Sequence, residues 1–228
     1  MSSLAEFTGL NSRKTSVVHV GGLRPTNDLF ASNFGLKPLG LPGEQWPVLK
    51  DKPLLFVCQL NLTAAPFVPP LLADIKMMTF FVKTGFGSLK KDNGEDWNLR
   101  AYKSLDGLIP MTAPAKTPSV KRGFECRWEE AVDHPIYDDP DLIVPEGFDN
   151  SDVELDHLYR TKIGGYASNI QSAPWWHEGD HAAAPAYCWQ IASEEKAGLV
   201  WGDGGAIYLA RGTAAGFEDE WFLDWQSY

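Results

Sequence analysis

Residues 174–181 read P-W-W-H-E-G-D-H and contain the pattern H-E-x-x-H. On an α-helix this spacing places two histidines on one face as metal ligands, and the glutamate beside them activates a metal-bound water. His177 and His181 would be the ligands here and Glu178 the general base, which indicates a metal-dependent hydrolase. A structural or nonspecifically bound metal, held by His177, Asp180 and His181, is the other metal site that this segment allows.

The residues in and around the motif disfavour a metal site. Gly179 lies inside the motif, and glycine costs about 1 kcal/mol relative to alanine within a helix. Pro185 allows only a short helix, and no histidine follows His181, so Glu194 or Glu195 would have to complete the coordination. We therefore expect a polar loop here, with no metal and no other cofactor, and keep the hydrolase as an alternative.

Nucleophilic catalysis has no better support. The chain lacks the G-x-S-x-G pattern, and Cys58 and Cys188 lie in apolar runs, where burial raises a thiol pKa. The acidic runs at 138–141 and 218–220 are typical of solvated surface, because nothing in the sequence pairs two carboxylates across a cleft. We expect that the protein is not an enzyme.

The charge balance restricts the partners. The 228 residues include 30 acidic and 20 basic ones, for a net charge of −10, which disfavours nucleic acid and suits docking on a basic protein. The first residues lack the apolar core of a secretory signal, and no apolar run reaches membrane-spanning length. Three cysteines do not make a disulfide framework. We expect a cytoplasmic protein that binds no membrane.

The tryptophan pair in the opening segment is a candidate contact site. If the segment is extended, adjacent side chains point to opposite sides, so both rings cannot face inward. An exposed Trp beside acidic groups is typical of a binding hot spot, whereas packing of both rings over the core edge is an equally good interpretation. The predicted partner-contact residues are Trp175, Trp176, Glu178, Asp180, Asp138, Asp139 and Asp141.

The sequence also indicates an internal duplication. V-V-H-V-G-G-L at 17–23 resembles R-T-K-I-G-G-Y at 160–166, and each is followed by an apolar run with one Gln, at 54–60 and 186–191. A further apolar run comes next in both halves, at 77–82 and 206–210. This order predicts a single domain over 1–228, built from repeats at about 15–85 and 157–212 with an irregular middle segment.

The repeated elements are interpreted as structural. Gly-Gly after a strand permits positive φ, and a Gln in an apolar strand needs bonds to neighbouring backbone, with ligand binding by the Gln pair as the alternative. The run 197–209 has two strand-like segments around G-D-G-G, which predicts a type I′ hairpin. The predicted structural residues are Gly21, Gly22, Gln59, Gly164, Gly165, Gln190, Trp201, Asp203 and Gly204.

Few helices are expected. A capping box predicts a short helix over 151–159, and another short helix is possible only after Pro70. Further strands are expected at 99–102, 120–128 and 221–226, with a long loop over 133–156. The predicted fold class is α+β, mainly antiparallel β with an internal duplication, as two packed sheets or a pseudo-barrel, and a few short helices.

These motifs resemble the YwqG-like proteins, a bacterial family without an assigned activity. The residues concerned are Gly21-Gly22, F-V-C-Q-L-N-L at 56–62, I-G-G-Y at 163–166 with Gln171, and Q-I at 190–191 followed by G-L-V-W-G-D-G-G at 198–205. The resemblance spans about 15–225 but leaves out 24–45 and 133–150. It implies an α+β fold with a duplication and supplies no catalytic residues. Members that resemble this chain occur beside bacterial toxins, where some look like immunity proteins.

We therefore expect a non-enzymatic cytoplasmic binding protein. The preferred hypothesis is an immunity protein that neutralises a bacterial toxin with a basic surface by direct binding. The alternatives are the metal-dependent hydrolase with His177, Glu178 and His181, and a small-ligand binding module with its site between the two repeats.

Overall fold

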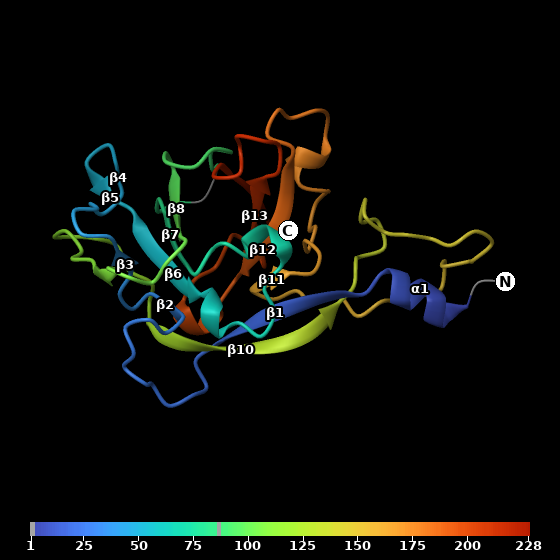
Figure 1. Cartoon of the computed structure of the whole chain (residues 1–228), viewed down its shortest axis with the longest axis horizontal. Helices are drawn as coiled ribbons and strands as arrows, with labels where there is room; N and C mark the ends of the chain where they lie inside the picture. Colours follow the sequence, from blue (N-terminus) through green and yellow to red (C-terminus); the bar gives the residue numbers. More distant parts are fainter. Residues whose placement is uncertain (1–2, 86–87) are drawn as a thin grey trace.

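The computed structural model describes residues 3–85 and 88–228. Within these residues its main element is an antiparallel sheet of ten strands in the order β14-β13-β12-β11-β1-β10-β2-β6-β7-β8 (Figure 1). The strands are β1 (Arg13–Val20), β2 (Asn33–Phe34), β6 (Leu55–Asn61), β7 (Met77–Val82), β8 (Trp97–Tyr102), β10 (Phe124–Asp133), β11 (Lys162–Gly164), β12 (Pro185–Ala192), β13 (Ala206–Gly212) and β14 (Trp221–Gln226).

Short elements surround this sheet. One α-helix, α1 (Leu4–Leu10), is found in the described chain and begins after the N-cap Ser3, whose hydroxyl accepts a hydrogen bond from the Glu6 N–H. The small strand pairs are β3 (Leu39–Gly40) with β9 (Ile109–Pro110), and β4 (Val48–Leu49) with β5 (Lys52–Pro53). The 3₁₀ turns are η1 (Leu62–Ala64), η2 (Pro70–Leu72), η3 (Trp175–His177) and η4 (Glu195–Ala197).

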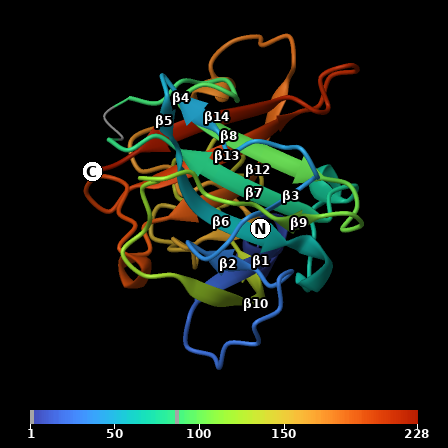
Figure 2. The same ribbon diagram turned by 90° about the vertical axis from the view of Figure 1, so that its left-hand side faces the viewer.

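The sheet curls until its two edge strands are bridged (Figure 2). Between them, Asp92 forms an isolated β-bridge with Phe222 of β14, and the Leu223 N–H donates to the Lys91 carbonyl at 3.0 Å. On the other side the Asn93 side chain exchanges two hydrogen bonds with the backbone of Leu99 in β8. Segment 91–93 thus covers both edges, and this nearly closed, barrel-like sheet leaves few open backbone groups.

The predicted fold class is wrong. The described chain holds one large curled sheet with two small strand pairs in place of two packed sheets, and one α-helix in place of an α+β set of helices. The apolar runs of β6 and β7 are buried along their whole length, and such runs do not reveal how many sheets they build. The expected helix at 151–159 is absent, since Ser151 and Val153 close a turn on Asp149 and Asn150 and the chain then extends.

Two matching series of strands flank the central β1–β10 pair, namely β11-β12-β13-β14 beside β1 and β2-β6-β7-β8 beside β10. Each series has a register shift just before its Gln, between Phe56 and Cys58 and between Tyr187 and Trp189. Phe80 and Trp189, one from each series, meet edge to face in the shared core with ring centroids 6.1 Å apart. Whether the series arose by duplication, as two repeats in one domain, stays a prediction.

The two buried glutamines make equivalent bonds. Gln59 accepts from the Leu39 N–H at 2.8 Å and donates to the Ala31 carbonyl at 3.2 Å. Gln190 accepts from the Ser168 N–H at 3.0 Å and donates to the Arg160 carbonyl at 2.8 Å. Each amide therefore ties the segments before and after the short inner strand of its series to the sheet.

The Gly-Gly pairs do not occupy matching places. Gly21 and Gly22 follow β1 of the central pair, whereas Gly164 and Gly165 lie at the end of its direct neighbour β11, so the two pairs are on adjacent strands and not at equivalent positions of the two series. All four have φ between 66° and 75°. The position that matches Gly164 is Gly35, which follows β2 with φ +63°.

The predicted hairpin at 197–209 is also wrong. β13 begins at Ala206 and pairs with β12 and β14, and the glycine-rich run lies in the connection that precedes it. In that loop Trp201 is fully buried, the Asp203 carbonyl accepts from the Tyr228 N–H at 3.0 Å, and Gly204 has φ +59°. The positive φ values belong to a loop that packs on β14. The strand predicted at 221–226 is confirmed as β14.

The Gln190→Leu variant should be less stable by about 2–4 kcal/mol, because the buried N–H of Ser168 and carbonyl of Arg160 lose their partner. Urea unfolding followed by circular dichroism measures the loss. Gln45→Leu is the matched control at an exposed position and should change stability by less than about 0.5 kcal/mol. Equal losses in the two variants would contradict the structural role of Gln190.

Candidate functional site

The molecule has an arm that extends away from the barrel. Helix α1 and the irregular chain 134–156 run out together on one side (Figure 1). The rings of Phe7 and Phe148 stack with centroids 4.8 Å apart, and the Asn11 amide exchanges hydrogen bonds of 2.8 and 2.9 Å with the backbone of Ile143. We call α1 together with residues 134–156 the acidic arm.

The acidic arm concentrates negative charge and exposed apolar side chains. Residues 134–156 contain eight Asp and Glu residues and no Lys or Arg. Leu4, Tyr137 and Ile143 are 57%, 69% and 50% exposed, and Leu10 and Val144 are exposed beside them. Exposed apolar groups gathered on one projection are typical of a protein-interaction surface.

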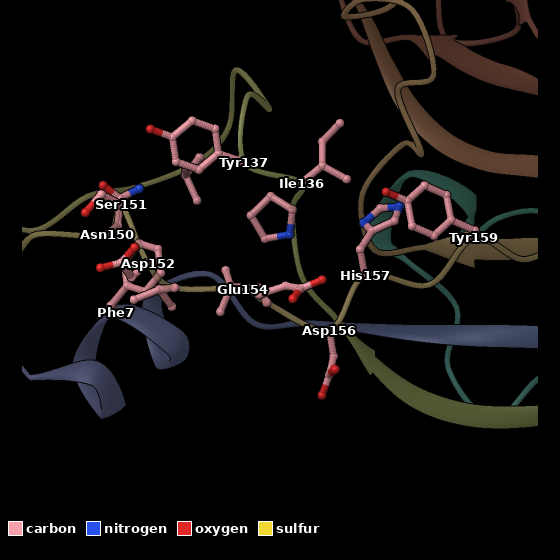
Figure 3. A pocket seen from close by; sticks show the side chains of 14 residues that line it. Phe7, Ile136, Tyr137, Asn150, Ser151, Asp152, Glu154, Asp156, His157 and Tyr159 are labelled. Atoms are coloured by element: carbon pink, nitrogen blue, oxygen red, sulfur yellow. The ribbon is translucent and has the colours of Figure 1, made fainter. Parts of the chain in front are cut away.

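A hollow of about 560 Å³ lies where the arm meets the barrel (Figure 3). We call it the arm hollow. Its size falls in the range of ligand-binding pockets. The exposed residues Asp152, Glu154 and Asp156 border it together with the exposed Tyr137 and Tyr159, and Figure 3 shows the Asp156 carboxylate directed away from Tyr137 and Ile136. Carboxylates and aromatic faces together favour a cationic group. The other lining residues are Phe7, Pro135, Ile136, Leu142, Asn150, Ser151, Val153, Leu155 and His157.

A buried ion pair lies at the base of the arm, where the chain leaves the barrel and returns to it. Asp133, the last residue of β10, accepts from the Lys162 ammonium of β11 at 2.7 Å, and both side chains are fully buried. The carboxylate also accepts from the N–H groups of Leu158 and Tyr166 at 2.9 and 2.8 Å. Burial lowers the pKa of Lys162 to about 8, and Asp133 opposes this shift.

Gly165 is required by this arrangement. Its φ is +69°, and a Cβ at this position would lie 2.3 Å from a carboxylate oxygen of Asp133. Any side chain would displace the carboxylate that holds Lys162 and Leu158.

His157 lies at the floor of the arm hollow with only 3% of its side chain exposed. Its Nδ1 is 2.6 Å from the His134 carbonyl and therefore donates, which leaves Nε2 to accept from the Ser168 hydroxyl at 2.8 Å. Burial, aided by the Lys162 charge, lowers the pKa of His157 to about 4. The imidazole is neutral and holds segment 156–158 against the barrel.

Ser168, His157 and Asp133 have the composition of a catalytic triad without its geometry. The His157 Nδ1 donates to a backbone carbonyl and lies 3.7 Å from the Asp133 carboxylate, and Ser168 is buried and also accepts from the Gln190 amide at 2.8 Å. A nucleophile needs an open approach and an oriented base. These three groups make a structural network.

The tryptophan pair packs on the barrel. Trp176 is buried at 6% exposure, and the half-buried Trp175 donates from its indole N–H to the Leu223 carbonyl at 2.9 Å. The Lys91 ammonium covers the Trp175 ring at 4.1 Å from its centroid. Glu178 and Asp180 are exposed in the loop that follows. The pair therefore offers little free aromatic surface to a partner.

The predicted acidic contacts lie on the arm but differ in availability. Asp138 is exposed, and Asp141 forms an ion pair with Arg13 at 3.1 Å. Asp139 is buried and accepts from the Asp141 N–H at 2.9 Å and from the Asn169 amide at 3.3 Å. Only Asp138 of the three presents a free charge.

The H-E-x-x-H segment does not form a metal-binding helix. Only η3 is helical, Gly179 has φ +78°, and the His181 ring packs against Phe222 with centroids 4.9 Å apart. Across residues 3–85 and 88–228, no group of three His, Cys, Asp or Glu side chains is placed to hold a metal. The three cysteines are free and buried, and burial raises the pKa of each thiol.

The family model that matches residues 32–210 is described as a domain of unknown function, DUF1963, and the chain belongs to this family. The match extends from β2 into β13 and includes the loop of the acidic arm. No curated protein matches the chain. None of the helices in the described residues has the length and apolar character needed to cross a membrane.

Sequence reasoning missed the anchor of the site. Lys162 was considered only as part of the repeated stretch R-T-K-I-G-G-Y. A lysine that is buried in a strand requires an acidic partner. That signal predicts a pair but does not name Asp133, 29 residues away along the chain.

The Lys162→Met variant should lose about 3–5 kcal/mol of unfolding free energy, because the Asp133 carboxylate stays buried without its counter-charge. Chemical denaturation measures this loss. Lys14→Met removes an exposed pair with Glu130 and should cost less than about 1 kcal/mol. Similar losses of unfolding free energy for the two variants would show that the buried Asp133–Lys162 pair does not stabilise the fold more than an exposed pair does.

Acid should weaken the fold through His157. Its pKa is lower in the folded chain, so the unfolded chain binds more protons below about pH 6.5, and stability falls as the pH drops from 6.5 towards 4. Urea midpoints at pH 7.5 and 5.0 measure the fall for the wild type and for His157→Gln. The variant should show a smaller fall, and an identical fall in both proteins would rule out His157 as its source.

Proposed function

We propose that this member of the DUF1963 family is a non-enzymatic binding protein that receives a basic surface of a partner protein on its acidic arm. The observation that supports it best is the arm hollow, which exposed acidic residues and tyrosines border at the base of a projecting, partly apolar arm. Surfaces of one charge on a projecting element steer an oppositely charged partner and fix its orientation.

The charges of the arm are available to a partner. Asp138, Asp152, Glu154 and Asp156 are exposed, and none of them forms an ion pair with a described residue of the chain. A carboxylate without an internal partner loses no existing ion pair when a lysine or arginine approaches. The exposed Leu10, Ile143 and Val144 then supply the apolar contact area that charge alone does not give.

We further propose that the partner is a bacterial toxin and that the protein acts in the cytoplasm as its immunity protein. This step rests on the resemblance to YwqG-like proteins, some of which look like immunity proteins beside toxin genes, and on the acidic balance of the chain. The contact surface in this proposal is the acidic arm, with Glu178 and Asp180 outside it.

Neutralising the arm should abolish protection. We expect the variant Asp138→Asn, Asp152→Asn, Glu154→Gln, Asp156→Asn to bind the toxin about a hundredfold more weakly, because four unpaired charges are removed. Growth of cells that co-express the protein and the product of the neighbouring gene, together with binding by calorimetry, measures the effect.

The matched control removes four exposed carboxylates outside the arm, with Glu178→Gln, Asp180→Asn, Glu195→Gln and Glu220→Gln. It should protect like the wild type. Full protection by the arm variant, or absence of any complex between the wild type and the neighbouring product, would refute the proposal.

A further inference from the structure

Segment 152–157 connects the arm to the barrel as a straight strand-like piece of chain outside the sheet. Figure 3 shows it running from Asp152 through Glu154 to Asp156 along the arm hollow. Its ends are fixed, since the Val153 N–H donates to the Asn150 carbonyl at 3.1 Å and the Leu158 N–H donates to Asp133.

One edge of this segment has open backbone groups. In an extended chain the N–H and C=O of alternate residues point to the same edge. The Asp156 carbonyl faces the His134 imidazole at 3.1 Å, so the edge with residues 154 and 156 faces His134. On the other edge, the N–H groups of Leu155 and His157 have no acceptor among the residues that the structure describes.

The open edge faces the arm hollow. His134 lines a separate hollow of about 370 Å³ on its own side of the segment, with Leu4 and Thr8. His157 lines the hollow of about 560 Å³ together with Pro135 and Tyr137, and residues 152–156 border both hollows. A second strand can therefore approach the Leu155 edge, and main-chain bonds to such an edge are a common mode of peptide recognition.

We propose that an extended segment of the basic partner adds to the Leu155 edge as a β-strand, with Lys or Arg at every second position. This rests on the proposed function and specifies how its partner is recognised. Glu154 and Asp156 lie on either side of Leu155 in the extended part of the segment, so these two carboxylates share one face, whereas Asp152 belongs to the turn that precedes it. Cross-strand neighbours share that face, which places basic residues at positions i and i+2 of the added strand, and a third one two positions further reaches the turn with Asp152.

The neighbouring residues suit this occupant. The exposed rings of Tyr137 and Tyr159 border the hollow and offer faces to the cationic heads, while their edges contact the aliphatic stems. Basic residues in an unbroken run would point to both faces of the added strand, and half of them would meet Val153 and Leu155. The alternation of acidic and apolar residues in the segment therefore favours a partner strand whose basic residues are two positions apart, in addition to favouring its positive charge.

Two synthetic peptides with the same composition test this inference against the full chain. One is Thr-Lys-Thr-Lys-Thr-Lys-Thr and the other Thr-Thr-Lys-Lys-Lys-Thr-Thr, both capped and fluorescently labelled. Fluorescence anisotropy should show about tenfold tighter binding of the alternating peptide, and the variant Asp152→Asn, Glu154→Gln, Asp156→Asn should lose this preference. In NMR exchange, the alternating peptide should slow the amides of Leu155 and His157.

Equal affinity for the two peptides, no binding of either, or unchanged exchange at Leu155 and His157 would overturn the inference. The proposed function would still be supported in that case if the protein neutralises the toxin and the arm variant fails to protect.

The opposite combination is also distinguishable. If the peptides bind as expected but the toxin does not bind, strand addition is supported and only the proposed identity of the partner is refuted.

Discussion

The burial of the Asp133 carboxylate is the constraint from which the rest of the site follows. A buried carboxylate is tolerated only when its charge and lone pairs are matched, and Asp133 achieves this with the Lys162 ammonium and two backbone N–H groups. Because one N–H belongs to Leu158, the same carboxylate that links β10 to β11 through the Lys162 ion pair also fixes where the acidic arm returns to the barrel. Gly165 leaves room for it.

The polar network continues from this point into the sheet. His157 bridges the His134 carbonyl and the Ser168 hydroxyl, and Ser168 bonds to Gln190. Each of these polar groups forms a hydrogen bond with the next one, so the network connects the arm to the strand series that contains β12. In the other series Gln59 holds an equivalent loop without a buried lysine or an arm. The arm is thus an addition on one side of an otherwise balanced sheet.

Part of this could be predicted from the sequence. The strands at 77–82, 206–210 and 221–226 were predicted because apolar or alternating runs of this length are typical of β-strands. The helix at 151–159 was wrong because a capping box is a local signal, and α1 was not predicted. The G-D-G-G hairpin failed because positive φ is as useful in a loop as in a turn.

The candidate site was harder to predict, because its parts come from distant segments. The acidic run at 138–141 was found, yet its value as a contact depends on ion pairs and burial that only folding decides, as Asp139 and Asp141 show. The tryptophan pair could equally have been a core edge or a contact surface, and Lys91 over Trp175 places it at the covered edge of the barrel. Asp152, Glu154 and Asp156 became candidates only once the hollow was known.

If a basic partner protein lies on the acidic arm, carbodiimide cross-linking of the complex should join the two proteins there. This reagent joins a lysine of the partner to a carboxylate in contact with it, and mass spectrometry locates the bond. We expect cross-links at Asp138, Asp152, Glu154 and Asp156. Cross-links confined to Glu178 and Asp180, or to 218–220, would contradict it.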